Sequence, residues 1–250
     1  MAIWGKLIGG AAGLALGGPL GAILGAIAGH AYDRGKAERG PGIHGQGRPD
    51  LSATRQAAFT TAVIVLSAKM AKADGVVTKD EIRAFKQIFH VPKSAAAEVG
   101  VLFNRARKES AGFEPYAHQI ATLFAHHRVV LEDLLGGLFH IARADGRVSP
   151  EEIAYLKEVA RIFGFDAKAF ERIAAAHLGQ GIADPYDVLG VKPDISDEAL
   201  KKAYRQLIRE NHPDRLMAQG MPQEFIEIAN EKMARINDAY AQIEKMRGRS

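Results

Sequence analysis

A glycine stands at every fourth position from Gly5 to Gly29, in a stretch that carries no charged side chain between Lys6 and Asp33. At about 1.5 Å per residue, a helix over residues 7–31 would measure roughly 37 Å, against a hydrocarbon core of about 30 Å. Leu and Ile fill the spaces between the glycines, where a flexible leader would carry Ser and other polar residues. We therefore predict a transmembrane helix over residues 1–32.

The glycine ladder also predicts a partner for this helix. Residues four apart lie along one helix face, and small residues there let a second backbone approach closely within a membrane. On a straight helix such a row winds about the axis by about 40° per step, so it cannot face one neighbour over its whole length. We expect a homodimer whose closest contact involves Gly13, Gly17 and Gly21.

A cleavable secretion signal is the alternative, because Ala26-Ile27-Ala28 has the small-x-small form of a cleavage site. The single Lys before the apolar stretch and the length of that stretch favour the membrane span. More basic residues follow the span than precede it: Lys6 lies alone before it, and Arg34, Lys36, Arg39 and Arg48 follow it. The positive-inside rule then places the C-terminal part of the chain in the cytoplasm, with the anchor in a bacterial inner membrane. Whether the helix is ever cleaved is left open.

Residues 33–50 alternate charged residues with Gly and Pro and show no apolar periodicity, which is typical of a linker. The chain has no cysteine, so disulfides, thiolate nucleophiles and cysteine-bound zinc are excluded. Its net charge of +4 is small and does not indicate a nucleic-acid partner.

Residues 51–179 carry apolar side chains at spacings of three and four, which predicts an all-α domain. One pattern occurs twice within it, as AKADGVVTKDEI at 71–82 and ARADGRVSPEEI at 142–153. In each copy an Asp-Gly pair suits the end of one helix, because Gly accepts the left-handed conformation. A Thr or Ser three residues before a Glu then forms a capping box that starts the next helix. We predict a duplicated helical hairpin.

The acidic residues of the two copies have a second interpretation, as ligands of a divalent cation. They are Asp74, Asp80, Glu81, Asp145, Glu151 and Glu152. Their spacing lacks the alternating oxygen ligands of an EF-hand loop, so capping is the favoured role and we expect no metal. His118, His126, His127 and His140 lie on helical patterns without a catalytic or zinc motif.

The duplicated D-G-x-V-[ST]-x-x-E hairpin resembles the TerB-like domain. That resemblance implies an all-α module that accompanies stress and envelope functions and for which metal binding is sometimes proposed. It implies no reaction.

The C-terminal stretch DPYDVLGVKPDISDEALKKAYRQLIRENHPDRL predicts a helix that Ser196 caps. Leu200, Ala203, Tyr204 and Leu207 form its apolar stripe, and Pro213 forces the chain out of the helix at His212. A second helix is expected to open at Pro222 and to pack antiparallel to the first, with His212, Pro213 and Asp214 in the loop between them. A basic ridge follows another face of the first helix, at Lys201, Lys202, Arg205 and Arg209.

This arrangement resembles the J domain of DnaJ-type co-chaperones over residues 184–250. The resemblance rests on YDVLGV, KKAYRQL, the His-Pro-Asp tripeptide and INDAY, which stand in the order of that family. It implies that the basic ridge and the tripeptide dock on a DnaK-type chaperone of the heat shock protein 70 family and trigger ATP hydrolysis there. The chain itself would be neither an enzyme nor a cofactor-binding protein. No Gly/Phe-rich stretch follows Arg247 in this sequence and it holds no cysteine, so we expect the usual client-binding modules of that family to be absent.

Taken in order, the anchor, the TerB-like domain and the J domain resemble the membrane-anchored DnaJ-type co-chaperones of bacteria. We expect a co-chaperone that activates DnaK at the inner membrane. The alternative function is a membrane-tethered scaffold for envelope stress, in which the TerB-like domain binds a partner or a metal. A solvated ridge or a nucleic-acid surface would not explain why the ridge runs into the His-Pro-Asp tripeptide. The sequence does not indicate the client or the oligomer size.

Overall fold

The computed structural model describes residues 17–22, 51–73, 83, 85–86, 91, 96–108, 112–144, 146–178 and 184–248. Every regular element in these residues is a helix and none is a strand, so the predicted all-α fold is confirmed. The bounds of the helices before residue 179 are α4 (Leu51–Ala73), α6 (Ala96–Lys108), α7 (Glu114–Leu123), α8 (Arg128–Ala142), α9 (Pro150–Ile162) and α10 (Ala167–Leu178).

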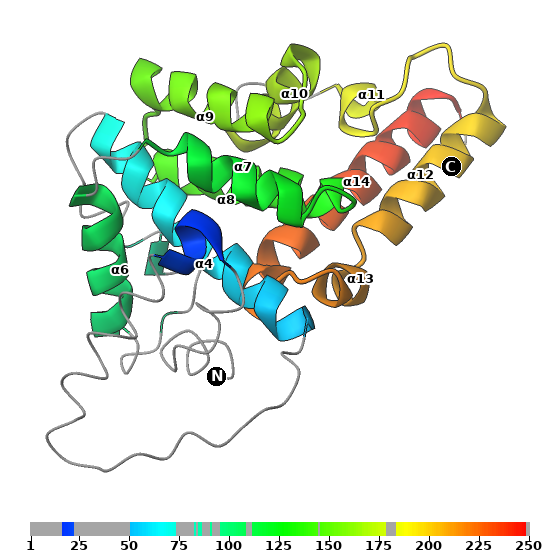
Figure 1. The fold of residues 1–250 in the computed structure, drawn as a ribbon. Coiled ribbons are helices and arrows are strands. Elements are labelled where there is room, and N and C mark those ends of the chain that lie inside the picture. Colours follow the sequence, from blue (N-terminus) through cyan, green and yellow to red (C-terminus); the bar gives the residue numbers. More distant parts are fainter. Residues whose placement is uncertain are drawn as a thin grey trace, which may run out of the picture.

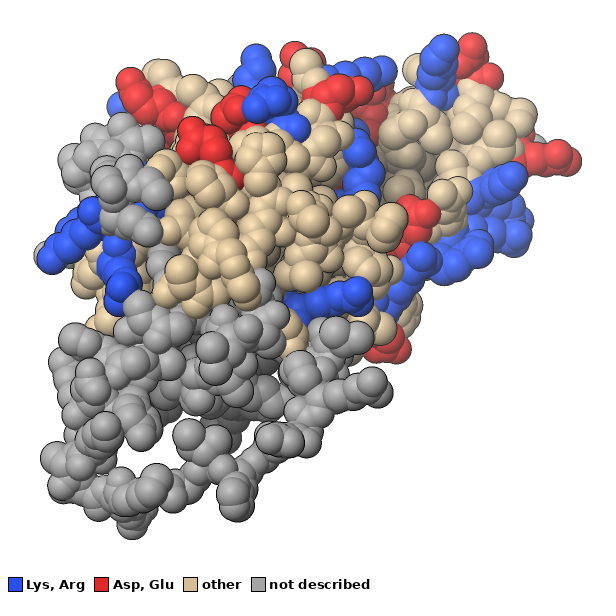
Figure 2. All heavy atoms as spheres, in the orientation of Figure 1, with Lys and Arg blue, Asp and Glu red and all other residues tan. Residues whose placement is uncertain are grey.

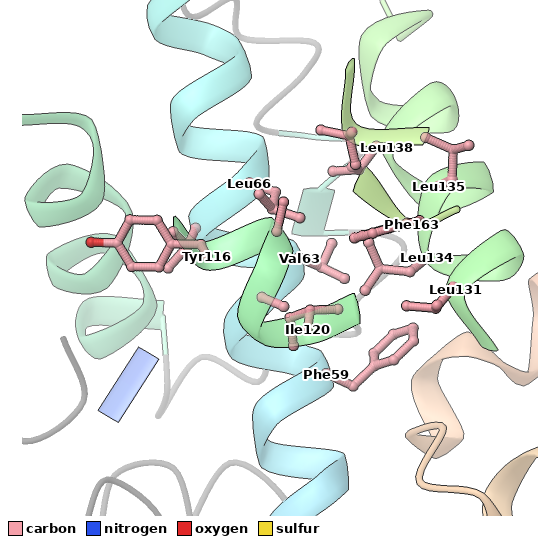
Figure 3. Close-up of a cluster of buried hydrophobic side chains, with 14 of the residues drawn as sticks. Phe59, Val63, Leu66, Tyr116, Ile120, Leu131, Leu134, Leu135, Leu138 and Phe163 are labelled. Atoms are coloured by element: carbon pink, nitrogen blue, oxygen red, sulfur yellow. The ribbon is translucent and has the colours of Figure 1, made fainter. Parts of the chain in front are cut away.

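Helix α4 runs through the centre of this first group, in contact with α6, α7, α8 and α9 (Figure 1). Residues 57–71 are buried on every side and most of their side chains are apolar, as expected for a helix surrounded by neighbours. The largest cluster of buried side chains lies where α4 meets α7, α8 and the end of α9 (Figure 3). The labelled members are Phe59, Val63, Leu66, Tyr116, Ile120, Leu131, Leu134, Leu135, Leu138 and Phe163.

One side-chain hydrogen bond joins two helices inside this core. The Tyr155 hydroxyl donates a hydrogen bond of 2.8 Å to the backbone oxygen of Leu66 in α4, where α4 and α9 meet. Burial raises the pKa of Tyr155 well above its ordinary value. The hydroxyl therefore stays protonated and supplies the donor that this buried site needs.

The second copy of the repeated hairpin has the predicted left-handed glycine and the predicted capping box. Gly146 has a φ of 90°, in the left-handed region. Ser149 Oγ accepts from the backbone N–H of Glu152 at 3.1 Å, and Glu152 Oε2 accepts from the backbone N–H of Ser149 at 2.8 Å. This capping box starts α9 with Pro150 in its first turn. The turn of the first copy, residues 74–82, lies outside the described residues.

The C-terminal elements are α11 (Pro185–Val188), α12 (Asp197–Glu210), α13 (Pro213–Ala218), the short 3-10 helix η1 (Gln223–Phe225) and α14 (Ile226–Met246). Helices α12 and α14 lie side by side (Figure 1). A second, smaller core between them contains Leu189, Leu200, Ile236, Ala239 and Ile243. Beside it the rings of Tyr204 and Tyr240 stack with their centroids 4.1 Å apart. The predicted helical hairpin is confirmed.

The start of the second hairpin helix was predicted wrongly. It begins at Ile226 rather than at Pro222, and α13 and η1 occupy the connection. Pro213 is responsible for the first of these turns, because a proline that ends one helix also suits the first turn of the next. Gly220, with a φ of 104°, then follows α13 in the left-handed conformation.

Part of the glycine-rich segment is described as well. Residues 18–22 form one helical turn, with left-handed backbone at Gly17 just before it and at its first residue, Gly18 (φ of 56° and 57°). Gln119 of α7 holds this turn, since its side chain accepts from the N–H of Leu20 and donates to the oxygen of Gly17, both at 2.9 Å. Leu20 is fully buried. The left-handed glycines interrupt the continuous helix that we predicted through this point.

Among the described residues, no helix combines the length and the apolar character that a membrane crossing requires. Residues 1–16 and 23–50, which hold the rest of the predicted span, Gly13 and the predicted linker, lie outside the described part of the chain.

Substitutions at two glycines test the packing of α8 against α10, one at the contact and one as a control elsewhere. A Cβ at Gly136 would lie 2.6 Å from Nε2 of His177, whose ring stacks on Phe139 at a centroid distance of 6.0 Å. We expect Gly136→Ala to lower the free energy of unfolding by about 1–2 kcal/mol, because overpacking outweighs the gain in helix propensity. Gly100 of α6 has open space around it, so Gly100→Ala should raise stability by about 0.5–1 kcal/mol. Urea titrations monitored by circular dichroism measure both changes, and a stabilised Gly136→Ala variant would contradict this packing.

Candidate functional site

The basic ridge, defined by Lys201, Lys202, Arg205 and Arg209, lies on the outer face of α12. All four side chains are exposed, whereas Leu200 is buried against α14 on the opposite face. Together with Glu198 they line a shallow hollow. None of the four cations makes an ion pair within the described residues. Figure 2 shows this ridge as a band of blue side chains. It is an unneutralised cationic surface.

The His-Pro-Asp tripeptide follows directly after α12, at the start of α13. His212 is the N-cap residue, with an extended backbone (φ −63°, ψ 130°), as the following proline requires. Its Nδ1 accepts from the backbone N–H of Asp214 at 3.2 Å and lies 3.8 Å from the Asp214 carboxylate. Pro213 and Asp214 form the first turn of α13, so they do not lie in an open loop as predicted.

Both polar side chains of the tripeptide face solvent, with 51% of His212 and 83% of Asp214 exposed. A histidine that accepts a hydrogen bond at Nδ1 carries its proton on Nε2 when neutral, so the ring keeps one donor free for a partner. The Asp214 carboxylate is a ready acceptor for a cationic donor. The arrangement suits the binding of another molecule.

Two residues that the sequence analysis missed hold the ridge and the tripeptide in place. Asn211 is buried at the end of α12, and its side-chain amide donates to the oxygen of Leu207 at 2.8 Å. Arg247, just after α14, donates to the carboxylate of Asp197 at 2.7 Å and to the hydroxyl of Tyr186 at 3.1 Å. It also donates to the backbone oxygens of Pro193 and Ile195, each at 3.0 Å. The loop before α12 is thereby fastened to the far end of α14.

The tripeptide end of the hairpin is joined to the first group of helices through an apolar contact. Phe225 packs edge-on against Phe59 of α4, with ring centroids 4.5 Å apart. Leu216, Met221, Phe225 and Ala229 are buried in the large core around α4 and not in the small core between α12 and α14. The segment after the tripeptide therefore relies on the first domain for its core.

A cluster of buried charges also joins the C-terminal hairpin to the first group of helices, and we call this contact region the junction between the domains. Lys232 of α14 lies 3.0 Å from the Asp133 carboxylate and 3.1 Å from the Glu132 carboxylate, both on α8. Arg172 of α10 pairs with Glu132 at 3.1 Å. One turn along α14, Arg235 donates to the backbone oxygen of Ala176 at 3.1 Å. Three helices thus meet around one lysine.

The pKa values of this cluster follow from burial and charge together. Burial alone would raise the pKa of Glu132, but Lys232 and Arg172 outweigh it and hold that pKa at about 2. For Asp133 burial dominates and its pKa is raised, although Lys232 donates to Oδ1. Its second oxygen has no hydrogen-bond partner within the described residues. Burial would lower the pKa of Lys232, but Asp133 and Glu132 outweigh it and raise that pKa.

The candidate metal ligands are not brought together in the described residues. Asp74, Asp80, Glu81 and Asp145 lie outside them, Glu151 is exposed, and the Glu152 carboxylate accepts from the backbone N–H of Ser149. The described part of the chain holds no group of three His, Cys, Asp or Glu side chains that could bind a metal ion.

Three known families match consecutive parts of this chain. Residues 1–39 match the transmembrane domain of the co-chaperone DjlA, residues 60–175 the tellurite resistance protein TerB, and residues 184–250 the DnaJ domain. These are the anchor and the two resemblances noted in the sequence, in the same order. No solved structure matches the chain significantly.

Curated relatives match along almost the whole length. Co-chaperone protein DjlA of Photobacterium profundum is 32% identical over 98% of this chain and 99% of its own length. The DjlA proteins of Coxiella burnetii (30% identical, 97% of each chain) and Shewanella oneidensis (32% identical, 99% of each chain) are similar. With its anchor domain, its TerB-like domain and its J domain, the chain belongs to the DjlA family of membrane-anchored J-domain co-chaperones.

Proposed function

We propose that this protein stimulates ATP hydrolysis by a DnaK-type chaperone from the cytoplasmic side of the bacterial inner membrane. The observation that carries the proposal is the continuity of the basic ridge with an exposed His212-Pro213-Asp214 turn. Both features lie on one hairpin, and Asn211 connects them. A partner that docks on one of them meets the other.

The ridge and the turn have different tasks in this proposal. Exposed cations raise the rate of encounter with an acidic partner, and their effect falls with salt. Asp214 offers its carboxylate for a charge-assisted hydrogen bond, which contributes about 1.5–3 kcal/mol. His212 and Pro213 set the direction of the turn, because they fix the backbone at the start of α13. ATP is hydrolysed in the partner.

The membrane location is supported by the anchor domain that residues 1–39 match and by the basic residues that follow the glycine ladder. ATP and DnaK are cytoplasmic, so a J domain on the other side would have no partner. We also propose that the anchor pairs with a second copy of this chain. Clients would then reach DnaK through the TerB-like domain, the membrane or another protein.

Charge reversal on the ridge should slow the encounter between this protein and DnaK. We expect Arg205→Glu to raise the concentration that gives half-maximal stimulation of DnaK by about fivefold at low ionic strength, and by less at high salt, because screening weakens steering. Lys192 is exposed and lies off the ridge, so Lys192→Glu is the matched control and should change little. Single-turnover ATP hydrolysis at several salt concentrations measures both. An effect of Arg205→Glu that does not depend on salt would argue against steering.

A further inference from the structure

The residues assigned so far to the docking site are fewer than a standard interface contains. A standard interface buries about 800 Å² and about 20–30 residues on each partner. The ridge and the tripeptide together supply only Lys201, Lys202, Arg205, Arg209, His212, Pro213 and Asp214. A partner centred on the tripeptide must therefore cover neighbouring surface, and on the side of α13 that surface belongs to the TerB-like domain.

The contact between the two domains lies close to the tripeptide. Gly220, just after α13, approaches α4 so closely that a Cβ there would lie 2.5 Å from the Cβ of Arg55. Phe225 and Lys232 fasten the following segment to α4 and α8. Because this junction combines buried apolar contacts with paired charges, the TerB-like domain is held at a fixed position beside the tripeptide.

Four basic side chains gather at this position, here called the junction cluster: Arg55, His126, His127 and Arg215. They come from α4, the turn between α7 and α8, and α13. A Cβ at Gly220 would also lie 3.4 Å from the Phe124 ring, and the His127 ring packs against Phe124 with centroids 6.5 Å apart, so this turn lies beside Arg55 and the end of α13. Burial lowers the pKa of His127, and the nearby charges of Arg55, His126 and Arg215 lower it further. Neither Arg55 nor Arg215 has an ion pair within the described residues. Arg55 and Arg215 thus leave an unneutralised positive surface, with His126 and His127 beside it.

The junction cluster continues the ridge. Figure 2 shows blue side chains over α12 and further blue side chains below and to the left of them, toward the start of α4. Arg215 follows Asp214 directly in sequence and links the two basic surfaces. The positive surface thus runs from the J domain onto the TerB-like domain, with the tripeptide between its two parts.

We propose that the DnaK-type partner docks across both domains, and that Arg55 and His126 of the TerB-like domain contact its acidic surface. This inference rests on the proposed function and extends its docking site. Arg55 and His126 act as binding residues at the rim of the interface. The TerB-like domain then has a direct part in partner recognition.

Anionic lipid headgroups are the other binding partner that a basic surface near a membrane anchor could suit. The exposed carboxylate of Asp214 argues for a protein instead. It lies between the ridge and the junction cluster, where it would repel headgroup phosphates, whereas a folded partner can place a cation opposite it. The distinction is open to experiment, because lipid composition can be varied separately from DnaK.

The experiment uses the full chain in nanodiscs of phosphatidylcholine and measures single-turnover ATP hydrolysis by DnaK. We expect Arg55→Glu and His126→Glu each to raise the half-maximal concentration by about threefold to fivefold at low salt, with a smaller effect at high salt. Arg107→Glu is the matched control, because Arg107 is an exposed arginine on α6, on the side of the TerB-like domain away from α13 (Figure 1). It should stimulate DnaK as the wild type does.

His126 is exposed, so its replacement reports binding even if Arg55→Glu disturbs the contact with Gly220. The inference is overturned if His126→Glu and a folded Arg55 variant both act like the wild type while His212→Gln loses stimulation, and the proposed function then stands. Wild-type activity in His212→Gln would instead remove the proposed function itself. An effect of Arg55→Glu and His126→Glu that occurs in phosphatidylglycerol nanodiscs and is absent in phosphatidylcholine would assign the junction cluster to lipid and also overturn the inference.

Discussion

Replacing His212 with Gln, or Asp214 with Asn, is expected to abolish stimulation of DnaK while the fold stays intact. Both side chains are exposed, so their loss opens no cavity in either core. The His212→Gln variant lacks the imidazole Nδ1 that accepts from the Asp214 N–H, and the Asp214→Asn variant lacks the negative charge that a cationic partner group needs. Single-turnover ATP hydrolysis by DnaK measures the loss, and thermal unfolding monitors the fold.

Asp194→Asn is the matched control for this prediction. Asp194 is an exposed carboxylate in the same domain, away from the ridge and the tripeptide, so its neutralisation should leave stimulation and melting temperature unchanged. If His212→Gln or Asp214→Asn stimulates DnaK as the wild type does, the tripeptide is not the contact that triggers hydrolysis. If either variant melts early, its loss of activity reflects unfolding.

Lys232→Ala should produce the largest loss of stability. The substitution removes the only cation that pairs with Asp133 in the described residues and one of the two that pair with Glu132. Removing one partner of a buried ion pair costs about 3–5 kcal/mol, because the remaining charge stays desolvated without compensation. We expect a loss of that size in urea unfolding, with the junction between the domains weakened first.

Lys245→Ala is the matched control, since Lys245 lies on the same helix but is exposed. A change within about 0.5 kcal/mol is expected there, as for most surface substitutions. A Lys232→Ala variant that loses less than about 1 kcal/mol would show that the cluster is solvated and that the apolar contacts alone hold the junction.

Features that depend on neighbours in sequence could be predicted. The capping box of Ser149 and Glu152, the cap at Ser196 and the end of α12 before His212 each follow from residues at most a few positions apart. These features depend on short-range interactions, because in each cap a side chain forms a hydrogen bond with a backbone group only a few residues away. The ridge on α12 was predictable for the same reason, since helical periodicity alone puts its members on one face.

The junction between the domains could not be predicted. Lys232 and Asp133 are 99 positions apart, and nothing in the local pattern of either residue distinguishes a buried partner from a solvated one. Phe225 was likewise an apolar residue near the start of a helix, equally compatible with either core. The sequence does not say which core takes the segment after the tripeptide, because that depends on how the two domains meet.

The segment between α12 and α14 was predicted wrongly for a different reason. Pro213 was interpreted as the end of a helix, which is correct, but a proline also begins helices, and here it does both. Residues 213–218 contain enough helix-forming side chains for one further short helix. The signal was present in the Pro-Asp pair, where an acidic residue follows a proline in a first turn.

Full-length protein in nanodiscs, titrated against DnaK loaded with ATP, gives the most direct test of the central claim. The account predicts that the single-turnover hydrolysis rate rises with protein concentration and saturates, and that His212→Gln leaves the rate at that of DnaK alone. A rate that stays at the level of DnaK alone across the whole titration, with a DnaK preparation that responds to another J-domain protein, would contradict it.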